Sequence, residues 1–208
     1  MLPPRISSIF AMPRGPQVPS ASRTAHSQPG FVSLATRMLL PMDLPETQRI
    51  VDERTTLTEM LNYQRTVMVR KVSGLTKEQT LTRLEPSTLT LAGLLRHLTL
   101  VDIYWFIMVL RGEAMPPPWE AGDWESDPDW EMTSATDFTP EEIIADFKNT
   151  WREVSAVSAD MDLDHTGTRS DGTVISHRWV LAHLIEEYAR HNGHADFIRE
   201  SLDGSTGD

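Results

Sequence analysis

The chain has 208 residues, a formal net charge of −11 and no cysteine. This length suits one domain with its own hydrophobic core. The absence of cysteine excludes disulfides, thiolate zinc sites and cysteine nucleophiles, and it fits the reducing cytoplasm, where we expect the protein. The sequence has no run of about 18 apolar residues that would cross a membrane.

Charge is distributed unevenly along the chain. Residues 1–42 hold four of the 19 basic residues and no acidic residue, so residues 43–208 hold the other 15 basic and all 30 acidic residues, a net charge of −15. A region this acidic repels phosphate backbones and anionic lipid surfaces, which argues against nucleic-acid and membrane partners. Residues 1–42 are rich in Pro, Ser and Arg. We therefore interpret them as a disordered tail, or as a misassigned start with the working start near Met38 or Met42, in preference to a transit peptide.

Helical periodicity begins after this segment. Residues 46–72 space their apolar side chains for one face of a helix, and Ser73-Gly74 ends the pattern. Residues 75–84 predict a short connecting helix, since Thr76 and Gln79 have the spacing of a capping box.

A second long helix is predicted over residues 90–111. Gly112 ends it, and the prolines at 116–118 prevent its continuation. Residues 113–138 then form a long acidic loop with three tryptophans. Loops of this length inside compact domains are usually functional or disordered, and the tryptophans argue against disorder, so we expect the loop to pack over something.

The third helix has a clear start, because Thr139 is a favourable N-cap and Pro140 occupies the first helical position. Residues 162–175 read as a loop with a hairpin turn at 170–172. A fourth helix is expected from Ser176 to about Leu202. Four long amphipathic helices without a convincing strand predict an all-α, up-and-down four-helix bundle over residues 43–208.

The most informative polar residues lie on the apolar face of the fourth helix. Glu187 and His191 are four residues apart, so their side chains emerge one above the other, between Leu184 and Ile198. A buried carboxylate without a partner is costly, so Glu187 needs a cation or must stay protonated. Because no Lys or Arg is expected on the inward stripe of the second or fourth helix, a metal ion is the simplest partner.

The second helix supplies a third donor, His97, at the edge of its apolar stripe. Two histidines and one glutamate form a known ligand set for catalytic zinc and leave at least one coordination position open. The pattern also permits other interpretations. His97 alone could be a hydrogen-bonded core histidine, and Glu187 could pair with Arg65 or Arg152.

Further histidines and one acid lie near these three residues. His183 and His194 flank the Glu–His pair and could contact a ligand, contact substrate or face solvent; His194 could also compete as a ligand. His177 and His165 are in or near a loop and are read as structural. Asp102, one turn beyond His97, could orient a ligand or be an exposed acid.

Two stretches carry a family resemblance. Leu94-Leu95-Arg96-His97-Leu98, followed by Tyr104-Trp105-Phe106, resembles the second helix of the DinB/YfiT-like metal-binding bundle superfamily. Residues 179–196, WVLAHLIEEYARHNGHAD, resemble its last helix closely, in particular an actinobacterial branch. The resemblance covers about residues 45–202.

The superfamily usually supplies three histidines, one from the second helix and two, spaced i,i+4, from the last. This sequence departs from that set with Glu187, and the resulting His, Glu, His set is similar to that of mycothiol-dependent isomerases. Asn192 and His194 also replace an Arg and a Gln that many relatives carry beside Gly193.

The resemblance implies a metalloenzyme that uses a low-molecular-weight thiol such as mycothiol. His97, Glu187 and His191 would hold one divalent ion, Zn²⁺ before Ni²⁺ or Fe²⁺, while His194 and His183 are candidates for proton transfer or positioning. The partners would then be a small thiol and an electrophilic substrate, with transfer or isomerisation as the reaction; relatives also allow a homodimer. The alternative is a non-catalytic metal-binding bundle that acts as a stress-associated binding module.

Overall fold

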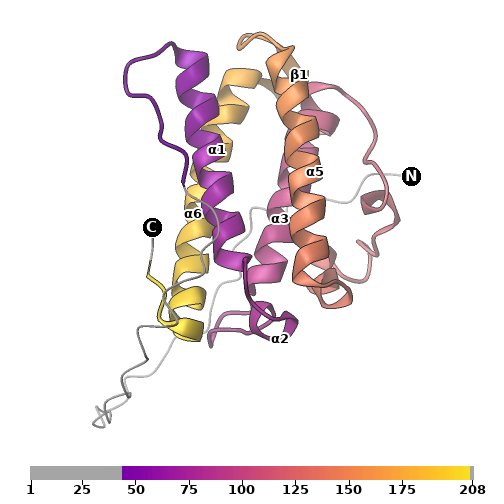
Figure 1. Cartoon of the computed structure of the whole chain (residues 1–208). Helices are drawn as coiled ribbons and strands as arrows, with labels where there is room; N and C mark the ends of the chain where they lie inside the picture. The colour runs from indigo at the N-terminus through magenta and orange to yellow at the C-terminus, as the bar shows by residue number, and fades with distance from the viewer. Residues whose placement is uncertain (1–43, 207–208) are drawn as a thin grey trace, which may run out of the picture.

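A computed structural model describes residues 44–206, and the interpretation of residues 1–42 lies outside this range. The described part is an all-α bundle, as predicted, and it also carries one small β-hairpin (Figure 1). Four long helical segments form it: α1 (Glu53–Val72), α3 (Leu91–Asp102) with its continuation η3 (Ile103–Leu110), α5 (Pro140–Ala159) and α6 (His177–Asp203).

The long helices run in two parallel pairs. The start of α1 lies at the end of α5, where the Arg54 guanidinium donates to the Ser158 carbonyl over 3.2 Å. The start of α6 lies beside the start of α1, where Arg178 and Glu53 form an ion pair with 2.8 Å between Nε and Oε1. Helices α1 and α6 are therefore parallel to each other and antiparallel to α3 and α5 (Figure 1). The predicted up-and-down order thus fails at one step, because α5 follows α3 in the chain but runs parallel to it.

The first helix begins later than the expected residue 46. Asp52 is the N-cap, and its side chain accepts a hydrogen bond from the Thr55 amide over 3.0 Å. The preceding segment folds back along the helix, where the Gln48 side chain donates to Glu59 over 2.9 Å. A good cap and a local side-chain contact therefore outweigh the apolar periodicity upstream of residue 53.

The connecting helix is shorter than the predicted 75–84. It occupies α2 (Lys77–Thr80), with Thr76 as N-cap and the predicted capping box to Gln79. The local cap was thus readable from the sequence, whereas the end of so short a helix was not.

The second long helix is the central one. Although it is interrupted by Arg96 and Asp102, the segment 91–110 is by length and mean hydropathy apolar enough to cross a membrane, but 94% of its most apolar 18-residue stretch is buried inside the bundle. Burial against the other helices therefore accounts for its composition. Its second half, η3, is π-helical, a wider turn that period-3.6 reasoning cannot anticipate.

The expected 113–138 loop contains three short helical pieces: η4 (Trp119–Ala121), α4 (Trp130–Thr133) and η5 (Ser134–Asp137). Trp119 is 1% exposed, so the segment packs over the bundle as predicted. It also returns the chain to the end of the bundle where α3 starts, which is why α5 can run parallel to α3.

The predicted turn at 170–172 joins two strands that the sequence did not reveal. β1 (Thr166–Thr168) pairs antiparallel with β2 (Val174–Ser176). Gly167 lies against the end of η3, where a Cβ atom would be only 2.0 Å from the Val109 carbonyl oxygen. The hairpin thus docks on the bundle through a position that admits only glycine.

Candidate metal centre

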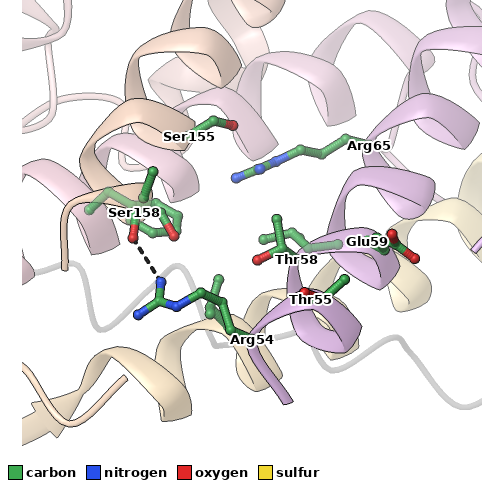
Figure 2. Close-up of a pocket in the computed structure, with 11 residues that line it drawn as sticks. Arg54, Thr55, Thr58, Glu59, Arg65, Ser155 and Ser158 are labelled. Atoms are coloured by element: carbon green, nitrogen blue, oxygen red, sulfur yellow. Dashed lines mark hydrogen bonds between the residues drawn. The ribbon is translucent and has the colours of Figure 1, made fainter. Parts of the chain in front are cut away.

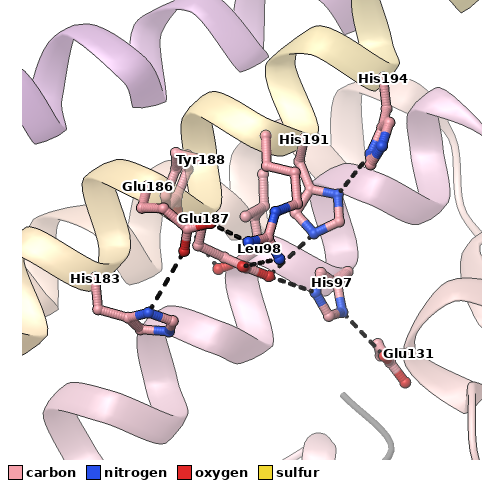
Figure 3. Close-up of polar contacts among 10 residues, drawn as sticks. His97, Leu98, Glu131, His183, Glu186, Glu187, Tyr188, His191 and His194 are labelled. Carbon is pink, nitrogen blue, oxygen red and sulfur yellow. Dashed lines mark hydrogen bonds and ion pairs between the residues drawn. The ribbon is translucent and has the colours of Figure 1, made fainter. Parts of the chain in front are cut away.

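Three donor side chains that are far apart in the sequence meet inside the bundle. His97 comes from α3, and Glu187 and His191 come from successive turns of α6 (Figure 3). One nitrogen or oxygen atom from each side chain lies within 4.8 Å of the other two. The structure therefore brings together the three residues that the sequence analysis selected.

The distances within this His–Glu–His cluster suit a shared ion. His191 Nε2 lies 3.0 Å from Glu187 Oε1, and His97 Nε2 lies 3.6 Å from the same oxygen. Two ligands of one tetrahedral zinc ion at 2.0–2.1 Å would be about 3.3 Å apart. No large movement of either helix is needed for these atoms to share an ion.

The cluster also contains buried polar atoms that lack a hydrogen bond within the described residues. His97 Nε2 and Glu187 Oε2 are both of this kind, and their residues are each 2% exposed. Buried polar atoms are normally paired, so these two call for a partner that the side chains around them do not supply. The donor set and the unpaired atoms fit a divalent cation.

The protein alternatives for Glu187 do not hold. Arg65 pairs with Asp102 at 2.9 Å, and Arg152 is exposed and donates to Asn149. The nearest cation is Arg190, whose guanidinium NH1 lies 3.6 Å from Glu187 Oε2 at the exposed edge. The alternative of a hydrogen-bonded core histidine agrees with one side of His97, because its Nδ1 contacts Glu131, while its Nε2 lacks a hydrogen bond within the described residues.

The prediction that no arginine lies inward on the second or fourth helix was wrong. Arg96 and Arg199 are 2% and 5% exposed. Neither contacts the cluster, because Arg96 donates to the Glu131 carbonyl and Arg199 donates to the Lys71 and Ser73 carbonyls. Backbone carbonyls and aromatic rings can hold a buried guanidinium, and the apolar pattern of a helix does not reveal such an arginine.

The side chains of the cluster shift one another's pKa values. Burial opposes ionisation of Glu187, but the contacts with His191 and His97 outweigh it and hold the pKa of this carboxyl well below its usual range. Burial likewise opposes protonation of His97, but contacts with Glu131 and Glu187 outweigh it and raise the pKa of this imidazole. The cluster therefore contains an anionic carboxylate, which attracts positive charge from a proton or a metal ion.

Glu131 is the site residue that the sequence analysis missed. It is 2% exposed, and its Oε1 lies 3.1 Å from His97 Nδ1 (Figure 3). It comes from α4, in the segment between α3 and α5. The only available signal was an acidic residue in a tryptophan-containing loop, and nothing in its spacing points to His97.

The two flanking histidines differ in their surroundings. His194 is half-buried, and its Nδ1 lies 3.4 Å from His191 Nδ1, but it is not among the three residues that form the cluster. His183 stacks on the half-exposed Trp179, with 4.7 Å between ring centroids, and meets the edge of Trp105. His194 thus lies at the rim of the cluster, and His183 lies one turn before Glu187.

The remaining candidates are structural. Asp102 accepts from Arg65 and from the Tyr188 hydroxyl over 3.0 Å, so it is a buried ion-pair partner rather than an exposed acid or a group that orients His97. His177 is buried and contacts Ser158, and His165 lies 3.0 Å from the Leu110 carbonyl. Both histidines were predicted to be structural, and their contacts agree.

A separate cavity of about 300 Å³ lies between α1 and α5 (Figure 2). Its two arginines already have protein partners, since Arg54 donates to backbone carbonyls and Arg65 pairs with Asp102. The cavity holds neither a histidine nor a residue of the His–Glu–His cluster among its lining residues. We therefore assign the chemistry to the cluster.

The fold and the cluster together define a DinB/YfiT-like four-helix bundle with a buried site that could hold a divalent ion. The family model described as mycothiol S-transferase matches residues 56–204, which include all four long helices apart from the first turn of α1. The chain belongs to the mycothiol S-transferase family. No curated protein matches the chain.

Proposed function

We propose that the protein is a divalent-metal-dependent S-transferase that joins the thiol of mycothiol to a small electrophile. The observation that carries this proposal is the buried His–Glu–His cluster inside a chain of the mycothiol S-transferase family. The family membership favours a transferase over the alternative of a non-catalytic, stress-associated binding module.

His97, Glu187 and His191 would hold the ion. When bound, a zinc-like ion lowers the pKa of a thiol at its open position and so supplies a thiolate nucleophile near neutral pH. The cysteine-free chain has no thiol of its own, so the sulfur must come from the cosubstrate. Imidazole and carboxylate donors suit Zn²⁺ and also accept Ni²⁺ or Fe²⁺.

His194 is the better candidate for accepting the thiol proton. It is half-buried at the rim of the cluster, and burial, with the charges of His191 and Arg190, lowers the pKa of its imidazole. A largely neutral imidazole at neutral pH can accept a proton. His183 is stacked on Trp179 and hence better suited to positioning a substrate.

The 113–138 segment would limit the access of water to the site. Glu131 is buried against His97, and Trp119 is buried against the guanidinium of the neighbouring Arg96. A dry site strengthens electrostatic interactions and protects an activated thiol from side reactions.

Cobalt substitution tests the proposal. Mycothiol added to the Co²⁺-loaded protein should produce a new near-ultraviolet sulfur-to-cobalt band, and the loaded protein should consume thiol in the presence of a fluorogenic alkylating reagent. A thiol blocked by S-methylation is the control and should produce neither signal. Unchanged spectra with mycothiol would refute thiol binding, and a band without thiol consumption would favour the binding module.

A further inference from the structure

Glu131 is the only acidic residue of the 113–138 segment that is buried among the described residues. Within residues 44–206, its side chain makes one hydrogen-bonding contact, with His97 Nδ1 at 3.1 Å, and its other oxygen lacks a hydrogen bond. Burying a carboxylate with only one of its oxygens hydrogen-bonded costs free energy. Its contact with His97 therefore points to a specific role for the carboxylate.

The contact fixes which nitrogen of His97 is available to a ligand. An ionised carboxylate only accepts hydrogen bonds, so His97 Nδ1 must carry a hydrogen and donate it in the bond to Glu131. The lone pair of the neutral ring is then on Nε2, the nitrogen that faces Glu187 at 3.6 Å. Since the imidazole ring lies between the two carboxylates, Glu131 cannot share with Glu187 an ion that binds Nε2 (Figure 3).

Arg96 holds the backbone of this segment against α3. Its Nε donates to the Glu131 carbonyl over 3.1 Å. Its guanidinium carbon lies 4.6 Å from the Trp119 ring centroid and 4.4 Å from that of Phe138, with Trp130 at 5.7 Å. A guanidinium surrounded by aromatic rings and bonded to a carbonyl anchors the segment at the residue that carries the carboxylate.

We propose that Glu131 is a positioning residue that sets the tautomer and orientation of His97 for metal binding, and that Arg96 with its aromatic cage delivers Glu131 to this place. The expected effect on metal affinity rests on the proposed function. The hydrogen bond itself does not depend on a metal. Histidine ligands commonly donate their second N–H to a carboxylate, which makes the ligating nitrogen more basic.

Zinc affinity is the first test, measured on the full chain by competition with a chromogenic chelator. Glu131→Ala should weaken zinc binding about 10- to 100-fold, the usual range for such partners. Glu131→Gln keeps an acceptor for the Nδ1 proton and should recover part of the loss. Glu120→Gln removes one exposed acid of the same segment and should bind like wild type. Equal zinc affinities for Glu131→Ala and wild type would overturn the proposal.

The tautomer of His97 is the second test, and it needs no metal. Imidazole ¹⁵N chemical shifts of the chelator-treated protein, recorded at a pH where His97 is neutral, should show Nδ1 protonated in wild type and Glu131→Gln. In Glu131→Ala the Nε2–H tautomer should appear. If Glu131→Ala keeps the wild-type tautomer, Glu131 is only structural. If wild type shows this tautomer but takes up no zinc, the proposed function fails while the positioning contact stands.

A double-mutant cycle tests the role of Arg96. Arg96→Lys keeps the charge but loses the planar group that fits the cage and donates to the Glu131 carbonyl. It should weaken zinc binding in the wild-type background and have little further effect in Glu131→Ala, because both changes act through the same contact. Additive losses would show that Arg96 acts independently of Glu131.

Discussion

At the scale of single residues, Glu187 decides the charge of the His–Glu–His cluster. The two histidines are neutral when they act as ligands, so Glu187 brings the one negative charge of the donor set. The same carboxylate contacts both histidines. A glutamate at this position therefore does more than a third histidine would, because it lies against both imidazoles and would neutralise part of the charge of a bound ion.

We expect Glu187→Gln to lower zinc affinity by more than the roughly 10- to 100-fold typical of outer-shell changes, because an amide is neutral and a poorer ligand. His97→Ala and His191→Ala should cause comparable losses. The measurement is competition with a chromogenic chelator. His194→Ala is the control, with a loss of about 10-fold at most. If Glu187→Gln binds like wild type while His194→Ala loses zinc, the ligand set is three histidines.

His177 gives the protein a pH dependence that is unconnected with the cluster. Burial lowers the pKa of His177, whose Nδ1 donates to the Asp162 carbonyl and whose Nε2 accepts from Ser158. The folded state thus binds fewer protons than the unfolded state, so the stability due to neutral His177 is complete above about pH 6.5 and is lost as the pH falls through the lowered value.

We therefore expect His177→Gln to lose stability at pH 7 and to show a smaller fall in stability between about pH 7 and pH 5 than wild type. Urea unfolding in the presence of a chelator measures this, since the chelator removes any contribution from metal. Parallel pH profiles for the variant and wild type would show that His177 does not titrate as described.

Some residues of the site could be predicted from the sequence and others could not. Glu187 and His191 could be found because an i,i+4 pair on an apolar stripe is a periodic signal, and His97 because it interrupts a second stripe. Glu131 and Arg96 could not be found in this way. Their contact crosses 35 positions and depends on how an irregular segment folds over α3, which no local pattern encodes.

At the scale of helices, the sequence specifies starts better than ends and interiors. Thr139 caps α5 with Pro140 as its first residue, and Glu142 completes a capping box. These are local contacts between neighbours in the sequence, so they can be read directly. The π-helical η3 and the two short strands depend on packing between segments. Period counting therefore misses them.

The buried pair between α1 and α3 is one such packing feature. Arg65 donates to Asp102 through Nε at 3.1 Å and through NH2 at 2.9 Å, and Tyr188 of α6 donates to the same carboxylate. Burial raises the pKa of Asp102, opposed by Arg65. The pair thus fixes the relative positions of the helices that carry His97 and Glu187.

Asp102→Asn should leave Arg65 as an unpaired buried cation and lower the free energy of unfolding by about 3–5 kcal/mol. Urea unfolding of the metal-free protein measures the loss. Arg178→Gln, which breaks an exposed pair with Glu53, is the matched control and should change stability little. A loss for Asp102→Asn below about 1 kcal/mol, the scale of exposed pairs, would contradict the assigned role.

At the scale of the whole molecule, the His–Glu–His cluster joins α3 and α6 around one buried carboxylate. Most of the core consists of apolar side chains, and Glu187 lies within it at 2% exposure. Without an ion, the cost of its burial is offset only by contacts with histidines and Arg190. Metal binding and folding should therefore be coupled.

An ion that binds only the folded chain stabilises it by about 2.7 kcal/mol when the free ion is at 100 times its Kd. For a domain of this size, that corresponds to a rise in Tm of roughly 5–10 °C. Calorimetry of chelator-treated protein measures the shift, before and after addition of one equivalent of Zn²⁺ and then of an excess. For a high-affinity site, the shift should reach most of its size at about one ion per chain.

Glu187→Gln is the control. It should show a smaller shift at the same zinc concentration, because its affinity is lower. Equal shifts in both proteins would place the stabilising ion elsewhere on the acidic surface, and no shift in wild type would falsify the metal centre.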